Sequence, residues 1–381
     1  MDITTCCIHG SRKKYDSTGA VSVPIFQSAT FAHPGVGQST GFDYSRQQNP
    51  TREHLEQTIC ALEEGTDALA FSSGMAAVSA LMELFAPGDH IIASDDLYGG
   101  SNRLFEHIAG KNGLSFSFAD TASIESILPL IKKETKALFI ETPSNPMMLV
   151  TDIAAAAEIC RAHGLLLIVD NTFLTPYLQK PLTLGADAVI HSGTKYLAGH
   201  NDTLAGFLAV KDSALSQRLR FIYKTTGACL SPFDSWLTIR GIKTLAVRME
   251  RQQQTALAIA NWLCTQPHVT NVYYAGLESH PQREVSLKQA RGFGAMLSFQ
   301  TDTAAMARRI LGNVSIIQYA ESLGGVESLI TYPMLQTHAD LAPEKRERKG
   351  INDRLLRLSV GLEDPRDLMD DLKNAMDGGN K

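Results

Sequence analysis

The sequence has no uninterrupted run of 18 apolar residues among its 381 positions, which is the shortest run expected of a membrane-spanning helix. Its first 14 residues, MDITTCCIHGSRKK, lack the apolar segment of a secretory signal. These two absences argue against a membrane partner and against export. We therefore expect the protein to work in the cytoplasm.

Cysteine is also scarce, and its spacing excludes two kinds of site. No pair of cysteines has Cys-x-x-Cys spacing, and a chain of this size does not depend on disulfide bonds for its core. The sequence thus predicts free thiols and no metal centre. The six cysteines stand at positions 6, 7, 60, 160, 229 and 264.

An excess of positive charge is missing as well. Lysine and arginine number 35 against 40 aspartate and glutamate residues, which gives a formal charge of -5. The densest basic run, at 345–349, itself contains a glutamate. Nucleic acid is therefore not an expected partner. The composition, 44% hydrophobic and 20% charged, is that of an ordinary globular protein.

The chain divides into three parts by composition and periodicity. Residues 1–50 are rich in Gly, Ser, Thr and Pro, and we expect them to form an extended arm that reaches a neighbouring subunit. Residues 51–240 are expected to form a large α/β domain. Residues 241–381 begin with a long helical stretch and contain strand candidates at 294–299 and 355–360, so we expect a smaller α+β domain there.

Strands and helices alternate regularly in the large domain. This order predicts a mostly parallel sheet with helices on both faces. Apolar periodicity predicts helices at 51–65 and 151–163, and short apolar runs predict strands at 90–94, 114–118, 137–141, 165–169 and 188–191.

Two motifs that often accompany such sheets are absent. No Gly-x-Gly-x-x-Gly follows the first strand, which argues against a dinucleotide-binding oxidoreductase. The Phe-Ser-Ser-Gly-Met sequence at 71–75 is not Gly-x-Ser-x-Gly, which argues against a serine hydrolase.

Polar residues follow four of the expected strands. Residues 71–75 precede a helix whose first amides could bind a phosphate, and 141–146, 170–172 and 192–195 each follow a strand. Ligands bind beyond the carboxyl ends of the strands in such sheets, so these segments should converge.

Each of these residues has an ordinary explanation when it is taken alone. Asp170 could be a turn residue, and Lys195 could be a surface lysine. Their combination, with an acid at one strand end, a lysine 25 positions later and a phosphate site upstream, predicts pyridoxal phosphate. The lysine would form a Schiff base with the cofactor, and the carboxylate would keep the pyridine nitrogen protonated.

The sequence resembles the Cys/Met metabolism family of pyridoxal phosphate enzymes from Thr18 to Glu363. This family includes cystathionine γ-synthase, cystathionine β- and γ-lyases and methionine γ-lyase. The resemblance implies fold type I, the fold of aspartate aminotransferase. It is carried by Tyr44-Ser-Arg46 with Asn49-Pro-Thr-Arg52, Ser73-Gly-Met75, Tyr98-Gly-Gly100, Glu141-Thr-Pro-Ser-Asn-Pro146, Asp170-Asn-Thr-Phe173, His191-Ser-Gly-Thr-Lys-Tyr196 and Glu321-Ser-Leu-Gly-Gly325.

The resemblance also implies roles at the cofactor. Lys195 and Tyr98 would be catalytic, Tyr98 would stack on the ring, and Asp170 would pair with the ring nitrogen. Asn145 would contact the ring hydroxyl group. The phosphate would be bound by Gly74, Met75, Ser192 and Thr194 of the same subunit and by Tyr44 and Arg46 of a neighbour, within a homotetramer built as a dimer of dimers.

The substrate would be a sulfur-containing amino acid. Arg357 would bind its α-carboxylate with two parallel hydrogen bonds, assisted by Asn145, Ser322 and Thr337. Arg103, Asp43 and Glu321 would face the second amino-acid end of cystathionine, although Asp43 could instead cap the arm and Arg103 could lie on an ordinary helix face.

The reaction is expected to be γ-elimination of L-cystathionine to cysteine, 2-oxobutanoate and ammonia, ahead of β-elimination to homocysteine, pyruvate and ammonia. Cystathionine γ-synthase, which joins an O-acyl homoserine to cysteine, remains an alternative. Methionine γ-lyase is less favoured, because Gly100 and Gly325 stand where those enzymes carry cysteine and aspartate. The effect of Asn201, where many relatives have serine, stays open. The presence of Lys195 argues against a non-catalytic binding protein.

Overall fold

Seven strands form the larger of two sheets in the computed structural model, which describes residues 1–11, 13, 18–339 and 343–379. Strands β2 to β6 run parallel, whereas β7 runs antiparallel to β1 and to β6. The expected mostly parallel sheet is confirmed. Its order is β1 (Asp67–Phe71), β7 (Gly206–Val210), β6 (Ala188–Ser192), β5 (Leu166–Asp170), β4 (Thr135–Glu141), β2 (His90–Ser94) and β3 (Ser115–Ala119).

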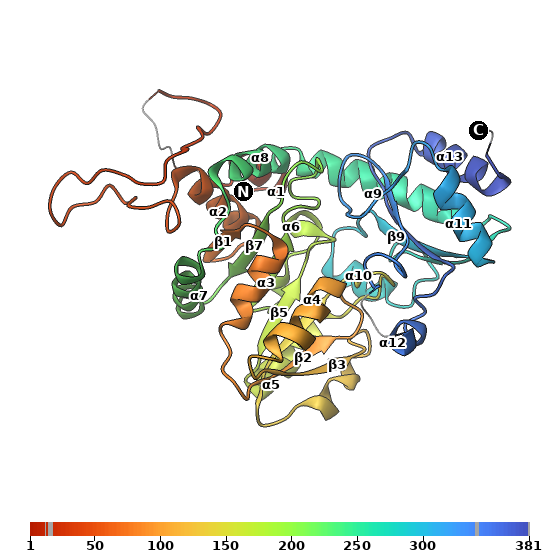
Figure 1. Ribbon diagram of the computed structural model, residues 1–381, viewed down its shortest axis with the longest axis horizontal. Coiled ribbons are helices and arrows are strands. Elements are labelled where there is room, and N and C mark those ends of the chain that lie inside the picture. Colours follow the sequence, from red (N-terminus) through yellow and green to blue (C-terminus); the bar gives the residue numbers. More distant parts are fainter. Residues whose placement is uncertain (12, 14–17, 340–342, 380–381) are drawn as a thin grey trace.

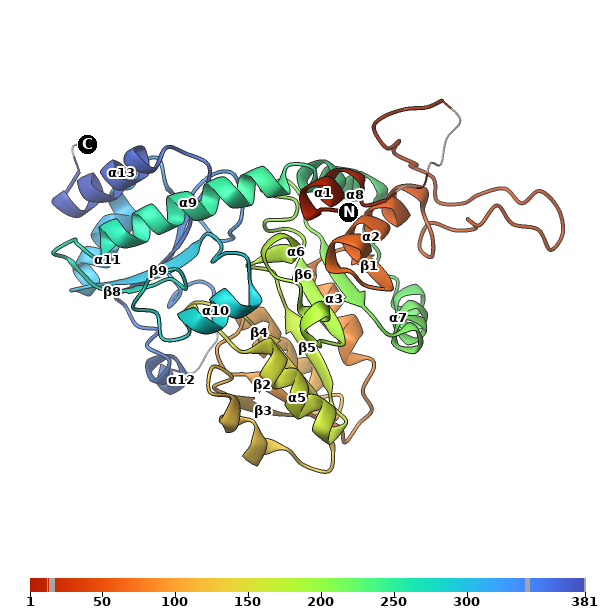
Figure 2. The same ribbon diagram turned by 180° about the vertical axis from the view of Figure 1, so that it is seen from behind.

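Helices cover both faces of this sheet because alternate strand residues on each side are apolar. One face packs against α2 (Pro50–Glu63) and α5 (Ile153–His163), and the other against α3 (Gly74–Met82) and α7 (Ser213–Thr226). Figures 1 and 2 show α3 and α5 on opposite sides. The shorter elements are α4 (Gly99–Arg103), α6 (Thr175–Leu178), a π-helix (Leu104–Ala109) and 3₁₀ turns at Ile124–Ser126, Leu128–Leu130 and Pro181–Leu184.

The smaller sheet has five strands and lies in the C-terminal part of the chain. Helices α9 (Leu245–Leu263), α11 (Ala304–Asn313) and α13 (Pro365–Asp377) pack together on it (Figure 1). Leu356 and Leu358 of β12 are buried in that core, so Arg357 between them points to the opposite face. The strand order is β10 (Gln318–Tyr319), β11 (Leu329–Thr331), β12 (Leu355–Ser359), β9 (Met296–Thr301) and β8 (Val269–Tyr273), with α10 (Arg283–Gln289) and α12 (Pro343–Arg348) around it. Helix α8 (Pro232–Ile242) packs against α2 instead.

The first residues differ from the expected extended arm. They form helix α1 (Ile3–His9), and Ile3, Cys6 and Cys7 are buried against α2 and α9. The helix was not predicted from the sequence, because it is short and its apolar side is made largely of cysteine. Residues 18–48 do leave the body of the molecule as a long extended segment (Figures 1 and 2).

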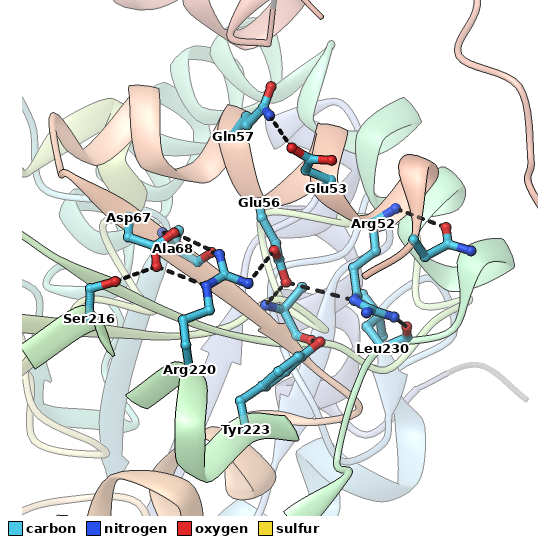
Figure 3. A network of polar contacts seen from close by, with 12 residues as sticks. Arg52, Glu53, Glu56, Gln57, Asp67, Ala68, Ser216, Arg220, Tyr223 and Leu230 are labelled. Atoms are coloured by element: carbon cyan, nitrogen blue, oxygen red, sulfur yellow. Dashed lines mark hydrogen bonds and ion pairs between the residues drawn. The ribbon is translucent and has the colours of Figure 1, made fainter. Parts of the chain in front are cut away.

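A polar network of buried and half-buried side chains joins α2 to the sheet and to α7 (Figure 3). Arg220 donates hydrogen bonds to Asp67 at 2.6 and 2.9 Å and to Glu56 at 2.8 Å. Glu56 also accepts the Ala70 N–H at 3.0 Å, and Arg52 lies 3.7 Å from it. The network thus fixes the helix that follows the extended segment. Among the described helices, none is both long and apolar enough to cross a bilayer.

Candidate active site

A pocket of about 350 Å³ lies at the carboxyl ends of β1, β4, β5 and β6, where the sequence analysis placed its four polar segments. The structure brings all four segments to this pocket. The predicted residues that line it on the cofactor side are Gly74, Met75, Tyr98, Asn145, Asp170, Ser192, Thr194 and Lys195, and those on the substrate side are Glu321, Ser322, Thr337 and Arg357.

Lys195 extends into this pocket from the turn after β6. Its amine donates a hydrogen bond to the Ser322 hydroxyl at 2.7 Å. Burial, together with the positive charge of Arg357, lowers the pKa of Lys195 to about 8. The amine is sheltered, oriented and easily deprotonated, which are the properties required of a nucleophile.

Ser322 holds this amine from an unusual backbone conformation. Its φ angle is 99°, in the left-handed region that residues other than glycine seldom adopt. Gly324 follows at φ 80°, and a Cβ atom there would lie 2.6 Å from the Tyr196 nitrogen. The segment of Ser322 therefore lies very close to the turn that carries Lys195.

Asp170 ends β5 and supplies a carboxylate at the base of the pocket. Thr172 donates two hydrogen bonds to its Oδ1, from the backbone at 3.0 Å and from the hydroxyl at 2.6 Å. In the described part of the chain no hydrogen bond is donated to Oδ2. Burial raises the pKa of Asp170, and the bonds from Thr172 oppose that rise. A half-buried carboxylate with one oxygen unused fits the cationic ring nitrogen of pyridoxal phosphate.

Glu141 is a second carboxyl group of the pocket, which the sequence analysis did not single out. It lies opposite Asp170 in the register of β4 and β5, and it accepts the Tyr98 N–H at 2.7 Å. Burial and the charge of Asp170 raise the pKa of Glu141 well above its usual range. We conclude that the protonated form of Glu141 is favoured beside the charged form of Asp170, because two adjacent buried carboxylates repel each other.

The start of α3 forms an anion site. The Ser73 side chain accepts the Ala76 N–H at 3.1 Å, and the helix begins at Gly74 beside Ser192 and Thr194. A Cβ atom on Gly206 would lie only 2.0 Å from the Ser73 carbonyl oxygen, so β7 packs directly behind this turn. Free helix amides next to two hydroxyl groups fit a phosphate.

Arg357 forms the opposite wall and is 2% exposed. Its Nη1 donates to the Asn145 side-chain oxygen at 2.8 Å, and its Nη2 donates to the Ser322 carbonyl and the Thr331 hydroxyl, both at 3.3 Å. Its buried Nε has no partner in the described residues. Burial lowers the pKa of Arg357 to about 10, so the guanidinium stays cationic at neutral pH. An unpaired N–H on a buried cation fits a substrate carboxylate.

Four predicted residues do not line this pocket within the described chain. Arg46 lies 5.6 Å from the Tyr44 ring centroid and donates to the Lys224 carbonyl oxygen in the last turn of α7. Asp43 accepts a hydrogen bond from Ser39 at 2.6 Å, and Arg103 lies on the exposed side of α4. Sequence proximity to Tyr98 therefore did not predict where the Arg103 side chain points.

The sheet order, the sheltered lysine, the half-buried acid and the helix-start anion site together define an enzyme of fold type I that depends on pyridoxal phosphate. Comparison with known proteins gives the family. The profile of the Cys/Met metabolism PLP-dependent enzymes matches residues 4–377. The chain belongs to this family.

Individual relatives carry three different activities in their names. Cystathionine gamma-lyase of Bacillus subtilis is 47% identical, with 99% of this chain and 100% of the relative covered. Cystathionine beta-lyase of Lactococcus lactis is 47% identical, with 98% and 99% covered. Cystathionine gamma-synthase of Haemophilus influenzae is 49% identical, with 98% and 97% covered. The crystal structure of cystathionine gamma-lyase from Lactobacillus plantarum with L-serine superposes with a TM-score of 0.97 at 42% identity, covering 99% of both chains.

Proposed function

We propose that this enzyme cleaves L-cystathionine by γ-elimination to cysteine, 2-oxobutanoate and ammonia. The observation that supports cystathionine as the substrate is a second, outer hollow that shares Thr194, Leu204, Glu321 and Ser322 with the pocket. Acidic side chains line it, namely Asp202, Asp234, Glu321 and Glu327. A substrate with an amino-acid group at each end can place one end on Arg357 and its distal ammonium among these acids.

Gly100 supports cystathionine over methionine as the substrate. A Cβ atom at this position would lie 2.3 Å from Cε1 of the Tyr98 ring. A cysteine side chain here would therefore displace Tyr98 from its present position over the pocket.

The mechanism that we infer assigns one task to each side chain. Arg357 binds the α-carboxylate, which places the substrate Cα near Lys195. The Lys195 amine, oriented by Ser322 and close to half deprotonated near pH 8, accepts the proton from Cα, releases it, and then removes a proton from Cβ. The electron pair left at Cβ forms the Cβ–Cγ double bond as the Cγ–S bond breaks. Pyridoxal phosphate, when bound by Lys195 and Asp170, supplies the electron sink that these proton transfers require.

Two further groups complete the reaction. The Tyr98 hydroxyl donates a proton to the departing sulfur, and the Asp170 carboxylate stays ionised beside the ring nitrogen. Glu141 accepts the Tyr98 N–H and so holds that residue at the pocket edge.

We further propose that Tyr44 and Arg46 bind the phosphate of a neighbouring subunit, within a dimer of dimers. The two residues belong to the segment 18–48, which projects from the body of the molecule (Figure 2), and neither lines its own subunit's pocket. A second copy is the natural acceptor for such a segment.

Product analysis tests the reaction. With L-cystathionine we expect 2-oxobutanoate and cysteine, and Lys195→Ala should abolish both without loss of fold. Pyruvate and homocysteine in their place would establish β-elimination instead. The γ-synthase remains the second candidate because one relative of that name is 49% identical. Faster formation of cystathionine from O-acyl homoserine and cysteine than its cleavage would favour this synthase.

A further inference from the structure

His338 is a buried histidine in the wall of the pocket, and the mechanism above does not use it. The side chain is 1% exposed. Its Nδ1 lies 2.8 Å from the Thr337 hydroxyl oxygen, and its Nε2 lies 3.1 Å from the Asn145 carbonyl oxygen. Thr337 lines the pocket, and Asn145 holds Arg357. The imidazole therefore connects two residues that contact the substrate side.

The hydrogen-bond partners of the two ring nitrogens determine which nitrogen of His338 carries the proton. A carbonyl oxygen only accepts hydrogen bonds, so Nε2 must carry the hydrogen that faces Asn145. Burial and the nearby charges of Arg357 and Lys349 lower the pKa of His338 to about 3. The ring is therefore neutral, Nδ1 is an acceptor, and the Thr337 hydroxyl donates to it. The Thr337 oxygen can then offer only lone pairs toward the pocket.

The turn that carries Tyr98 also contacts Thr337, next to His338. A Cβ atom on Gly99 would lie 2.2 Å from the Thr337 carbonyl oxygen, so the turn that carries Tyr98 packs directly against Thr337. A shift of His338 would thus move the loop after β4, the segment before α12 and the turn before α4 relative to one another.

We propose that His338 is a positioning residue for the site that binds the substrate α-carboxylate. Its neutral ring ties the Asn145 main chain to the Thr337 hydroxyl, which fixes the Asn145 side-chain oxygen on Arg357. The proposal rests on the role given above to Arg357, but it does not depend on which carbon-sulfur bond breaks. Loss of His338 should weaken amino-acid binding more than it slows bond cleavage.

Three substitutions separate the two hydrogen bonds. His338→Asn retains an acceptor near Thr337, His338→Gln retains a donor near Asn145, and His338→Phe removes both. For His338→Phe we expect KM for L-cystathionine to rise by about 10-fold to 100-fold, because a buried polar group loses its partner, while kcat changes by less than about threefold. Each polar variant should recover part of the loss.

Binding without turnover provides a second measurement. Glycine has an α-carboxylate and an amino group but no side chain to eliminate, so its Kd for the holoenzyme, measured by calorimetry, should rise in parallel with KM. His280→Gln is the matched control: His280 contacts the Met148 carbonyl at 3.0 Å on the same loop but not Asn145, Thr337 or Arg357. We expect wild-type glycine binding in this control.

Nitrogen-15 NMR of the wild-type holoenzyme tests the proton assignment even if His338→Phe fails to fold. The signal that disappears in His338→Asn should show a neutral ring protonated on Nε2 from pH 6 to pH 8. A ring that titrates in this range, or one protonated on Nδ1, would overturn the proposal. So would wild-type glycine affinity in His338→Phe, or a loss confined to kcat. Failure of the γ-elimination assay alone would leave these readouts intact and would contradict only the proposed reaction.

Discussion

Lys195, Asp170 and Glu141 lie in one pocket, and burial favours the uncharged form of each of them. It favours the neutral amine of the lysine and the protonated forms of the two carboxyl groups. Two hydrogen bonds from Thr172 oppose this effect at Asp170, whereas Glu141 also faces the charge of Asp170. We therefore expect the negative charge of the pair to reside on Asp170, where the ring nitrogen needs it.

Asp170→Asn should test this charge assignment. The substitution keeps the shape of the side chain but removes the charge, and we expect kcat to fall by about 10²- to 10³-fold. Steady-state kinetics with L-cystathionine provides the measurement. Asp187→Asn is a matched control, because Asp187 accepts the Leu167 N–H at 2.7 Å near the start of β6, away from the pocket. Equal activity in the two variants would contradict the assignment.

The lowered pKa of Lys195 predicts a pH dependence. With a pKa of about 8, about a tenth of the amine is neutral at pH 7, against less than about a thousandth for an ordinary lysine. After cofactor removal, trace acetylation of Lys195 followed by mass spectrometry should therefore rise through pH 8 and level off near pH 9. The exposed Lys111 serves as the internal reference. Reactivity of Lys195 that still climbs steeply at pH 10 would refute this prediction.

Among the secondary structure elements, the start of β7 and the start of α3 must approach very closely. Gly206→Ala would place a methyl group 2.0 Å from the Ser73 oxygen and 2.7 Å from the Gly74 nitrogen. We expect destabilisation by about 1–3 kcal/mol and cofactor binding weakened by about tenfold or more. Absorbance titration with pyridoxal phosphate measures the affinity.

A second glycine provides the control for this substitution. Gly312 lies on α11, where a Cβ atom would meet nothing within 4 Å. Gly312→Ala should leave cofactor affinity unchanged and should raise stability by about 0.5–1 kcal/mol. A Gly206→Ala protein that binds the cofactor like wild type would show that β7 does not shape the anion site.

Among these predictions, the largest loss of stability is expected from a substitution on helix α2 that breaks the network shown in Figure 3. Glu56→Ala would leave Arg52 without a carboxylate, Arg220 with Asp67 alone, and the Ala70 N–H without its acceptor. Because Arg52 is buried, we expect the free energy of unfolding in urea to fall by about 3–5 kcal/mol. Glu53→Ala on the same helix removes an exposed ion pair with Lys13 and should cost less than about 1 kcal/mol. Similar losses would argue against the network.

The sequence predicted the elements best where an apolar run had clear ends. The strand expected at 90–94 is β2, and the expected 188–191 became β6 with one added residue. The long helix expected from 241 is instead α8 and α9, with a break after Ile242. Strands β1 and β7 were not predicted, because their pairing with each other and with β6 depends on contacts that are distant in the sequence.

The same physical reason limits prediction of the site. Lys195 and Asp170 were predictable, because parallel strands bring their carboxyl ends to one edge. His338 was not, since its importance comes from a hydrogen bond to Asn145, which lies 193 positions away. The role of Glu141 depends on burial and on the Tyr98 N–H, neither of which its motif reveals.

At the scale of the assembled protein, the extended segment predicts subunit complementation. Tyr44→Ala/Arg46→Ala and Lys195→Ala should each lower activity strongly. Mixed dimers should regain about half of the wild-type activity, because one of the two sites in each mixed dimer has both sets of residues intact. Co-expression with two different tags, followed by assay of the doubly purified protein, provides the test. No recovery in the mixed dimers would place Tyr44 and Arg46 at their own subunit's site.

The pocket draws its walls from two sheets, since Lys195 and Asp170 come from the larger sheet while Arg357 and Ser322 belong to the smaller part. Heat need not loosen both parts at the same temperature. If the smaller part unfolds at the lower temperature, the holoenzyme should stay yellow after its catalytic activity is lost. The anion site and Asp170 would still be folded at that point, whereas Arg357 would no longer bind the amino acid. Bleaching and inactivation would then be two events in one chain, each reporting on a different sheet.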